Sequence, residues 1–266
     1  MAIPIALTIA GSDSSGGAGI QADLKTFAAL GVYGASVITA VTAQNTQGVS
    51  GIHGVPPAFV TAQLDAVFAD LDIKAAKIGM AGEPATIEAI ASALARWSVK
   101  HIVLDPVMVA SSGSRLLSPE AVVALRKKLV SRATLITPNL PEAAALLEEA
   151  VAFDESAIES QGKRLLAMGC EAVLIKGGHA HGAESIDYLF SGDDMIALRA
   201  PRIATDNTHG TGCSLSSAIA AGLAKGETLE AAVRNAKNFV SAAIAAGSRL
   251  DVGHGRGPLH HFHRFY

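Results

Sequence analysis

Short apolar runs alternate with longer helical patterns along almost the whole chain, and this alternation limits the possible folds more than any other feature. Residues 5–10 and 35–43 are rich in alanine and β-branched residues, which is typical of buried strands. Between them Ile20, Leu24 and Phe27 recur at helical spacing. The alternation predicts an α/β fold, with a mostly parallel sheet flanked by helices on both faces as a three-layer α/β/α arrangement.

The same pattern continues to the C-terminal end of the sequence. We expect further strands at 73–79, 101–105, 134–137 and 172–176, and helices at 59–71, from 84, and at 119–130, 141–149, 157–168, 213–224 and 229–246. Residues 185–190 and 195–200, separated by a polar turn, predict an antiparallel hairpin. We find no long linker and no internal repeat, so we expect a single domain over residues 1–266.

Composition excludes several classes of function. Half of the 266 residues are apolar and the formal net charge is -3, so nothing favours nucleic acid or an anionic membrane as a partner. No apolar run approaches the roughly 20 residues of a membrane-spanning helix, and the N-terminal run lacks the charged start of a secretory signal. The two cysteines, Cys170 and Cys213, do not form a secreted disulfide pattern. We therefore expect a cytoplasmic protein.

Polar residues and glycines follow the expected strands where each strand ends. Parallel-sheet proteins bind ligands at the carboxyl ends of their strands. That rule selects the following candidates: Gly11, Gln44, Gly79, Met80, Asp105, Asn139, Lys176, Gly177 and Gly178.

The strongest local motif is Asn-Thr-His-Gly-Thr-Gly-Cys at residues 207–213, directly before an apolar helix. Small residues allow close backbone approach, and the free N–H groups of a helix N-terminus bind anions. The motif predicts a phosphate site, with an ordinary glycine turn as the alternative. Cys213 is either a core cysteine or, at this helix N-terminus, a reactive thiol with a lowered pKa.

A second glycine-rich stretch, residues 11–19, fits a dinucleotide-binding pattern only loosely. Gly17 and Gly19 precede Ala22 as in G-x-G-x-x-A, but no acidic residue lies at 37–44 to hold a ribose. The G-x-x-x-x-G-K-[ST] loop is also absent from the sequence. Both nucleotide motifs are therefore disfavoured.

Oxygen donors and one lysine suggest a site for Mg²⁺ and phosphate. Asp105, Asn139 and Glu142 offer the ligands that Mg²⁺ prefers, although Asp105 could instead cap a turn and Glu142 could serve its helix dipole. Lys176 is a point charge suited to a phosphate. The histidine-rich tail at 254–263 matches no structural zinc spacing.

Taken in order, these motifs resemble those of the hydroxymethylpyrimidine/phosphomethylpyrimidine kinases, thiamine-synthesis members of the ribokinase-like superfamily. The resemblance rests on residues 11–26, on AQNT at 43–46, KIGM at 77–80, LDPVM at 104–108, TPNLPEA at 137–143 and KGGH at 176–179, and on residues 207–213. It extends from about residue 5 into the tail. It implies a ribokinase-like fold and the use of ATP and Mg²⁺.

The resemblance also implies two phosphorylations at one site, of the pyrimidine alcohol and then of its monophosphate. It places the substrate among Gly11, Asp23, Gln44, Met80 and Val107. It implies an anion hole at Gly210, Thr211, Gly212 and Cys213, with Cys213 as the base. Nucleotide contacts fall on Lys176, Asn139 and Thr208, and Mg²⁺ on Asp105 and Glu142. A homodimer is also expected.

One departure and two alternatives remain. The family commonly has Lys-Ser-Gly-Asp where this chain has Ser-Ser-Gly-Ser, so Ser111 and Ser114 replace a lysine and an aspartate. A pyridoxal kinase of the same superfamily is the nearest alternative, because its substrate also carries a hydroxymethyl group on an aromatic ring. A pyrimidine-sensing protein without catalysis is the non-enzyme alternative.

Overall fold

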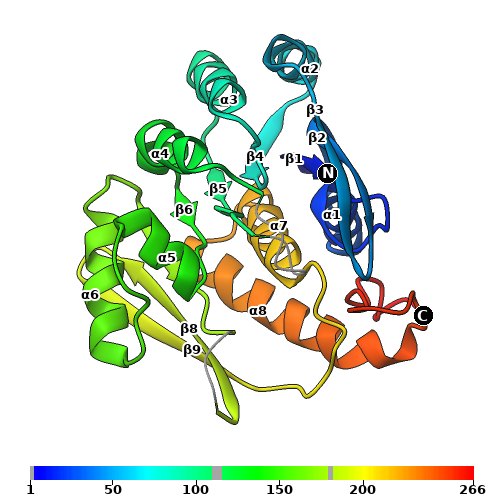
Figure 1. Cartoon of the computed structure of the whole chain (residues 1–266), viewed down its shortest axis with the longest axis vertical. Coiled ribbons are helices and arrows are strands. Elements are labelled where there is room, and N and C mark those ends of the chain that lie inside the picture. Colours follow the sequence, from blue (N-terminus) through cyan, green and yellow to red (C-terminus); the bar gives the residue numbers. More distant parts are fainter. Residues whose placement is uncertain (1–2, 110–115, 179–181) are drawn as a thin grey trace.

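The apolar runs form one nine-stranded sheet in the computed structural model, which describes residues 3–109, 116–178 and 182–266 (Figure 1). The strand order is β3-β2-β1-β4-β5-β6-β7-β8-β9. Strands β2, β1, β4, β5, β6 and β7 are parallel, whereas β3, β8 and β9 pair antiparallel to their neighbours. The strands are β1 (Ile5–Ser12), β2 (Tyr33–Asn45), β3 (Gly48–Gly54), β4 (Ile73–Ile78), β5 (Ile102–Leu104), β6 (Leu135–Ile136), β7 (Ala172–Ile175), β8 (Glu184–Ser191) and β9 (Asp194–Pro201).

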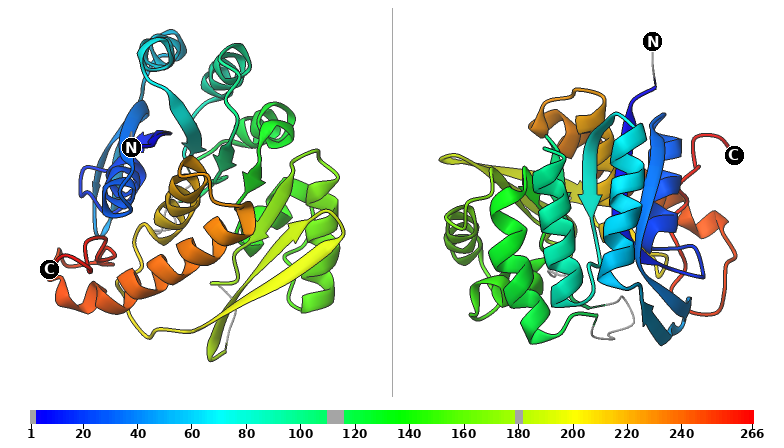
Figure 2. Two further views of the ribbon diagram at one scale, coloured as in Figure 1. Left: turned by 180° about the vertical axis from the view of Figure 1, so that it is seen from behind. Right: turned by 90° about the horizontal axis from the view of Figure 1, so that it is seen from above.

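Helices cover both faces of this sheet, which gives the three layers that the sequence predicts (Figure 2). One layer contains α1 (Gly19–Ala29), α7 (Thr211–Ala224) and α8 (Leu229–Ala246). The other contains α2 (Pro57–Asp70), α3 (Pro84–Arg96), α4 (Pro119–Lys128), α5 (Leu140–Leu147) and α6 (Glu155–Leu166).

Strand β1 shows why the chain needs both layers. Leu7 and Ile9 are fully buried in the core beneath α2 and α3, while Ala6 is fully buried against the layer of α1 and α7. Successive side chains of a strand point to opposite faces, so a central parallel strand is apolar at nearly every position. This explains the continuous apolar runs in the sequence.

Strand β3 was not predicted from the sequence. Its seven residues, GVSGIHG, include three glycines and show little alternation, and glycine is depleted in strands. It pairs with β2 through a short turn at Asn45–Gly48. The predicted hairpin of β8 and β9 is confirmed, and the other predicted elements are present with ends shifted by a few residues.

The carboxyl ends of the parallel strands meet at one edge of the sheet. Asp105 follows β5 directly and Lys176 follows β7, and the N-terminus of α7 lies at the same edge. Asn139, after β6, forms an isolated bridge with Lys176. Within the described ranges, no helix has the length and apolarity to span a membrane.

Candidate active site

A cavity of about 820 Å³ lies at this edge of the sheet. It is lined by every residue to which the resemblance gives a role, except Asp23, whereas the strand-end candidates Gly79 and Gly177 do not line it. These lining residues are Gly11, Gln44, Met80, Asp105, Val107, Asn139, Glu142, Lys176, Thr208, Gly210, Thr211, Gly212 and Cys213. Gln44 and Cys213, which come from opposite ends of the chain, therefore share one cavity.

One end of the cavity is shaped by Gly11, Gln44 and Met80. Gln44 lies one residue before the end of β2, at an irregularity in its pairing with β3, and its side-chain oxygen accepts a hydrogen bond from the Thr42 hydroxyl at 3.2 Å. A Cβ on Gly11 would lie 2.3 Å from the Met80 methyl group, so any side chain there would displace the thioether. The result is a half-buried slot between a carboxamide and a thioether, a shape suited to a flat polar ring.

Asp23 does not line this cavity, and its predicted contact with substrate is wrong. Its side chain is fully buried beneath the cavity wall, where the Lys77 ammonium group lies 2.8 Å from its carboxylate. The hydroxyls of Thr8 and Ser217 each donate to the same carboxylate at 2.6 Å. Three residues thus satisfy the carboxylate away from solvent, and Asp23 supports the cavity wall through Lys77 rather than facing the cavity.

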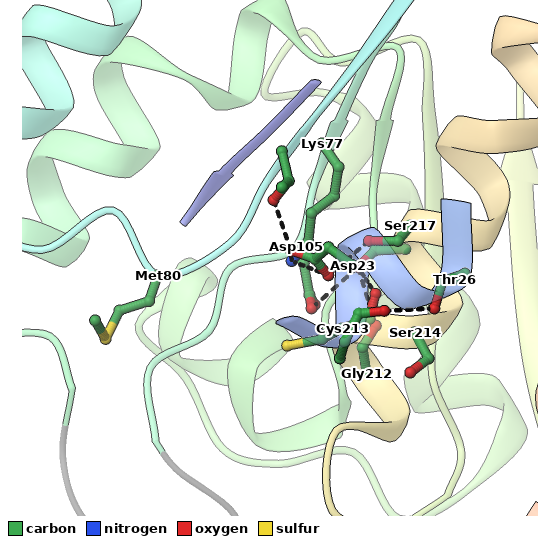
Figure 3. Close-up of polar contacts among 12 residues, drawn as sticks. Asp23, Thr26, Lys77, Met80, Asp105, Gly212, Cys213, Ser214 and Ser217 are labelled. Atoms are coloured by element: carbon green, nitrogen blue, oxygen red, sulfur yellow. Dashed lines mark hydrogen bonds and ion pairs between the residues drawn. The ribbon is translucent and has the colours of Figure 1, made fainter. Parts of the chain in front are cut away.

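Lys77 is a site residue that we did not predict as such. It lines the cavity, is fully buried, and lies close to Asp23 and Cys213 (Figure 3). Burial alone would lower the pKa of this lysine, but the negative charges of Asp23 and Asp105 hold it above its ordinary value. A lysine inside the apolar strand IKAAKI was the signal in the sequence.

The anion loop, which we define as residues 207–213, ends at the first turn of α7. Gly210 is the helix N-cap in a left-handed conformation with φ 83°, and no side chain caps the first amides of the helix. The Thr211 hydroxyl donates to the Thr208 carbonyl at 2.7 Å, which closes the turn. The helix therefore directs free N–H groups into the cavity, as an anion site requires.

Lys176 joins two carboxylates on the cavity wall beside this loop. Its ammonium group lies 2.8 Å from Asp105 and 3.7 Å from Glu142. Although burial would raise it, the Lys176 and Lys77 charges hold the pKa of Asp105 below its ordinary value. Burial raises the pKa of Glu142, and the nearby Asp105 charge adds to that increase against the opposing effect of Lys176. Asp105 and Glu142 thus share the single positive charge of Lys176.

The Asn139 side chain caps the N-terminus of α5 in this structure. Its side-chain oxygen accepts from the Glu142 amide at 2.8 Å, and the Glu142 carboxylate accepts from the Asn139 amide at 2.8 Å. This reciprocal pair is a capping box at the start of α5. Glu142 lies in the first turn of α5, where the helix-dipole alternative expected it, and the capping box fixes its carboxylate at the cavity wall.

The donor set fits a hydrated Mg²⁺. Asp105 and Glu142 place oxygen ligands on one wall, and the raised pKa of Glu142 marks a negative charge that a cation would relieve. Among the described residues, no three His, Cys, Asp or Glu side chains are grouped for a metal ion. Mg²⁺ commonly keeps several waters and uses one or two carboxylates together with substrate phosphates.

The predicted lowering of the Cys213 pKa is wrong for the structure as it stands. Burial raises the pKa of this thiol to about 11, even though the Lys77 charge and the Gly19 amide lower it and the Asp23 and Asp105 charges oppose them. The thiol lies in the cavity wall, where desolvation outweighs the effect of the helix N-terminus. Cys213 is therefore mainly protonated at neutral pH.

Two further side-chain pairs in the cavity were also missed. Asp13 pairs at 2.8 Å with His209 of the anion loop, and Asp187 and Lys237, which line the same cavity, pair at 2.7 Å. In each pair the partners are distant in sequence, so no local motif connects them. The departure at Ser111 and Ser114 lies outside the described residues.

The comparisons with known proteins agree with this geometry. The family model described as phosphomethylpyrimidine kinase matches residues 13–260. A hydroxymethylpyrimidine/phosphomethylpyrimidine kinase of Rhizobium meliloti (strain 1021) is 58% identical over 262 residues, which cover 98% of each chain.

Two solved structures show the same architecture. A Bacillus subtilis pyridoxal kinase in complex with ADP is 36% identical, with a TM-score of 0.92 over 100% of both chains. A phosphomethylpyrimidine kinase of Clostridium difficile 630 is 43% identical, with a TM-score of 0.81 over 91% of this chain and 99% of the other.

Proposed function

The chain belongs to the phosphomethylpyrimidine kinase family, and from this premise we propose that it phosphorylates 4-amino-5-hydroxymethyl-2-methylpyrimidine twice with ATP. The first transfer gives the monophosphate and the second gives the diphosphate, as part of thiamine biosynthesis. The observation that carries the proposal is the single cavity that holds Gln44 at one end and the anion loop with Cys213 at the other.

The aminopyrimidine ring fits the end formed by Gly11, Gln44 and Met80. A carboxamide has one acceptor and two donors, so Gln44 can pair with a ring nitrogen and the exocyclic amine together. Met80 and Val107 line the same cavity and offer apolar contact to the ring. The hydroxymethyl group is then directed along the cavity toward Cys213.

The other end is suited to the triphosphate of ATP. The Thr211 amide already donates to the Thr208 carbonyl at 3.2 Å, so the amides of Gly212 and Cys213 stabilise negative charge on the migrating phosphoryl group. Lys176 adds a positive charge beside them. Thr208 and Asn139 border the same region. Phosphoryl transfer needs positioning and charge neutralisation more than covalent chemistry.

Asp105 and Glu142 would hold Mg²⁺, which neutralises phosphate charge when bound. In its absence Lys176 is the cation between these carboxylates. Asp105 is further fixed by the Thr137 hydroxyl, which donates to it at 3.1 Å. The carboxylates are therefore held in place before the nucleotide arrives.

Cys213 acts as the base for the first transfer. In its ionised form the sulfur would accept the proton of the substrate hydroxyl, and its pKa of about 11 makes that form a strong base but a rare one at neutral pH. The Lys77 ammonium group stabilises the ionised form. The acceptor of the second transfer is a phosphate monoester, already ionised at neutral pH, and it requires no base.

The experiment is a comparison of kcat/KM for the pyrimidine alcohol and for pyridoxal, with ADP release measured and products identified by mass spectrometry. The Bacillus subtilis structure, which covers the whole chain, makes pyridoxal the alternative to test. We expect the pyrimidine alcohol to be preferred and to acquire a second phosphate. A preference for pyridoxal, with a single phosphorylation, would refute the proposal. The homodimer and the cytoplasmic location stay predictions.

A further inference from the structure

A buried hydrogen bond between two side chains connects the two glycine-rich loops that meet at the active site. The first is the acceptor loop, defined here as residues 11–19, and the second is the anion loop. His209 Nε2 lies 2.8 Å from the Asp13 carboxylate, and the two side chains are 7% and 2% exposed. The partners are 196 residues apart in sequence, so this contact is made only by the folded chain.

Asp13 organises the acceptor loop from within. Besides His209, its carboxylate accepts the amides of Gly17 at 3.1 Å and Ala18 at 2.7 Å, and both the amide and the hydroxyl of Ser15. Burial alone would raise the pKa of Asp13, but the hydrogen bonds from His209, Ser15 and Ala18 hold it well below its usual range. The carboxylate is therefore ionised and fixed by its own loop at neutral pH.

The backbones of the two loops are also in direct contact beside this pair. A Cβ on Gly210 would lie 1.9 Å from the Gly17 carbonyl oxygen, and a Cβ on Gly17 would lie 2.4 Å from the His209 ring. The Gly19 amide donates to the Cys213 sulfur. There is no room for a side chain at Gly17 or Gly210, where the two loops touch, so a shift of one loop displaces the other.

The C-terminal segment, residues 251–266, holds His209 from the opposite side. The His209 amide donates to the Gly257 carbonyl at 3.1 Å, and His209 forms a bridge with Pro258. Figure 1 shows this segment, in red, beside the turn between β2 and β3, where the Arg256 amide donates to the Thr46 carbonyl at 3.0 Å. His209 is thus fixed between a carboxylate and the tail, and its position determines that of the anion loop.

We propose that His209 is a positioning residue for phosphoryl transfer, which acts through Asp13 to fix the anion loop relative to the acceptor loop. The acceptor loop carries Gly11 at the ring end, and the anion loop carries the amides that receive the phosphoryl group. The pair therefore sets the distance between the acceptor oxygen and the migrating phosphorus. The inference rests on the proposed function, in which both groups occupy this cavity.

The test compares His209→Leu with His209→Gln in steady-state kinetics of both transfers. Leucine removes the donor, whereas the glutamine amide nitrogen reaches about as far as Nε2 and can donate to Asp13. A misplacement of about 1 Å can cost about 100-fold in rate. We expect His209→Leu to lower kcat about 10- to 100-fold for both transfers, with both KM values changed less than about threefold, and His209→Gln to restore most of the loss.

Controls separate positioning from folding and from the proposed function. His53→Leu removes an exposed histidine of β3 and should retain wild-type kinetics. Melting temperatures show whether each variant is folded under assay conditions, and His209→Asn, whose amide ends short of Asp13, replaces the leucine variant if that one does not fold. Wild-type protein that phosphorylates no pyrimidine would refute the proposed function itself.

With active wild-type protein, three results overturn the positioning role. These are an unchanged kcat in folded His209→Leu, a loss expressed only in KM, and a glutamine variant no more active than the leucine variant. A loss confined to the first transfer would also count against it, because loop geometry serves both transfers alike.

Discussion

Replacement of Cys213 by alanine should slow the first phosphoryl transfer much more than the second. The first acceptor is a neutral hydroxyl that must lose its proton, whereas the second acceptor is an ionised phosphate. General-base assistance is typically worth about 10²–10⁴ in rate, or roughly 3–5 kcal/mol of activation free energy. We expect kcat for the alcohol to fall by about that factor and kcat for the monophosphate to change less than about threefold.

The pKa of the thiol gives this prediction a second readout. With a pKa of about 11, about 3 in 10,000 Cys213 side chains are ionised at pH 7.5. As long as the pH stays below the pKa, the ionised fraction increases tenfold for each unit by which the pH is raised. The wild-type rate of the first transfer should therefore rise about tenfold per unit from about pH 7 to about pH 9. The alanine variant should lose this rise.

The assay is single-turnover product formation from each acceptor, with saturating Mg-ATP and rapid quenching. Cys170→Ala is the matched control, because Cys170 is buried in the core beneath the other helix layer. Equal losses in both transfers, or a first transfer that does not depend on pH in the wild type, would refute the role of the thiolate as base.

Three further predictions concern the structure around the site. Lys77→Met leaves the Asp23 charge buried and unpaired, so unfolding free energy should fall by about 3–5 kcal/mol, or roughly 5–9 °C in melting temperature. The double variant with Asp23→Asn should recover most of this loss, and no recovery would contradict the ion-pair account. Burial lowers the pKa of His261 from the ordinary 6.5 to about 4. As the pH falls below about 6.5, the unfolded chain therefore takes up a proton at this histidine before the folded chain does. The free energy of unfolding should drop by about 3 kcal/mol by about pH 4. His261→Gln should weaken the fall in melting temperature between about pH 6.5 and about pH 4. The same fall in the variant as in the wild type would exclude His261 as its source. Gly210→Ala places a Cβ 1.9 Å from the Gly17 carbonyl oxygen, at a residue whose φ is 83°. The kcat of both transfers should therefore fall at least about tenfold. Wild-type rates in this variant would show that the anion loop is not rigid.

The sequence predicted the layered fold because buried parallel strands impose continuous apolar runs. The cavity-lining positions at the strand ends could also be predicted, since Gln44, Asp105 and Lys176 are polar residues at or just after the ends of apolar segments. Strand β3 was missed because a glycine-rich edge strand has little packing to constrain its side chains.

The remaining errors involve contacts that only the folded chain makes. Asp23 has Lys77 as its partner, 54 residues away, and nothing local distinguishes a buried ion pair from a cavity residue. The Cys213 pKa was misjudged because the helix N-terminus can be read from sequence, whereas the degree of burial cannot.

The central claim is that one cavity holds the same ring during both transfers, and the KM values of Gln44→Leu test it most directly. Loss of a bidentate pairing costs about 1–3 kcal/mol, which corresponds to a rise of roughly 5- to 150-fold in KM. Because the ring is unchanged by the first transfer, the KM for the alcohol and the KM for the monophosphate should rise by the same factor. A rise for only one of the two acceptors, or for neither, would contradict the account.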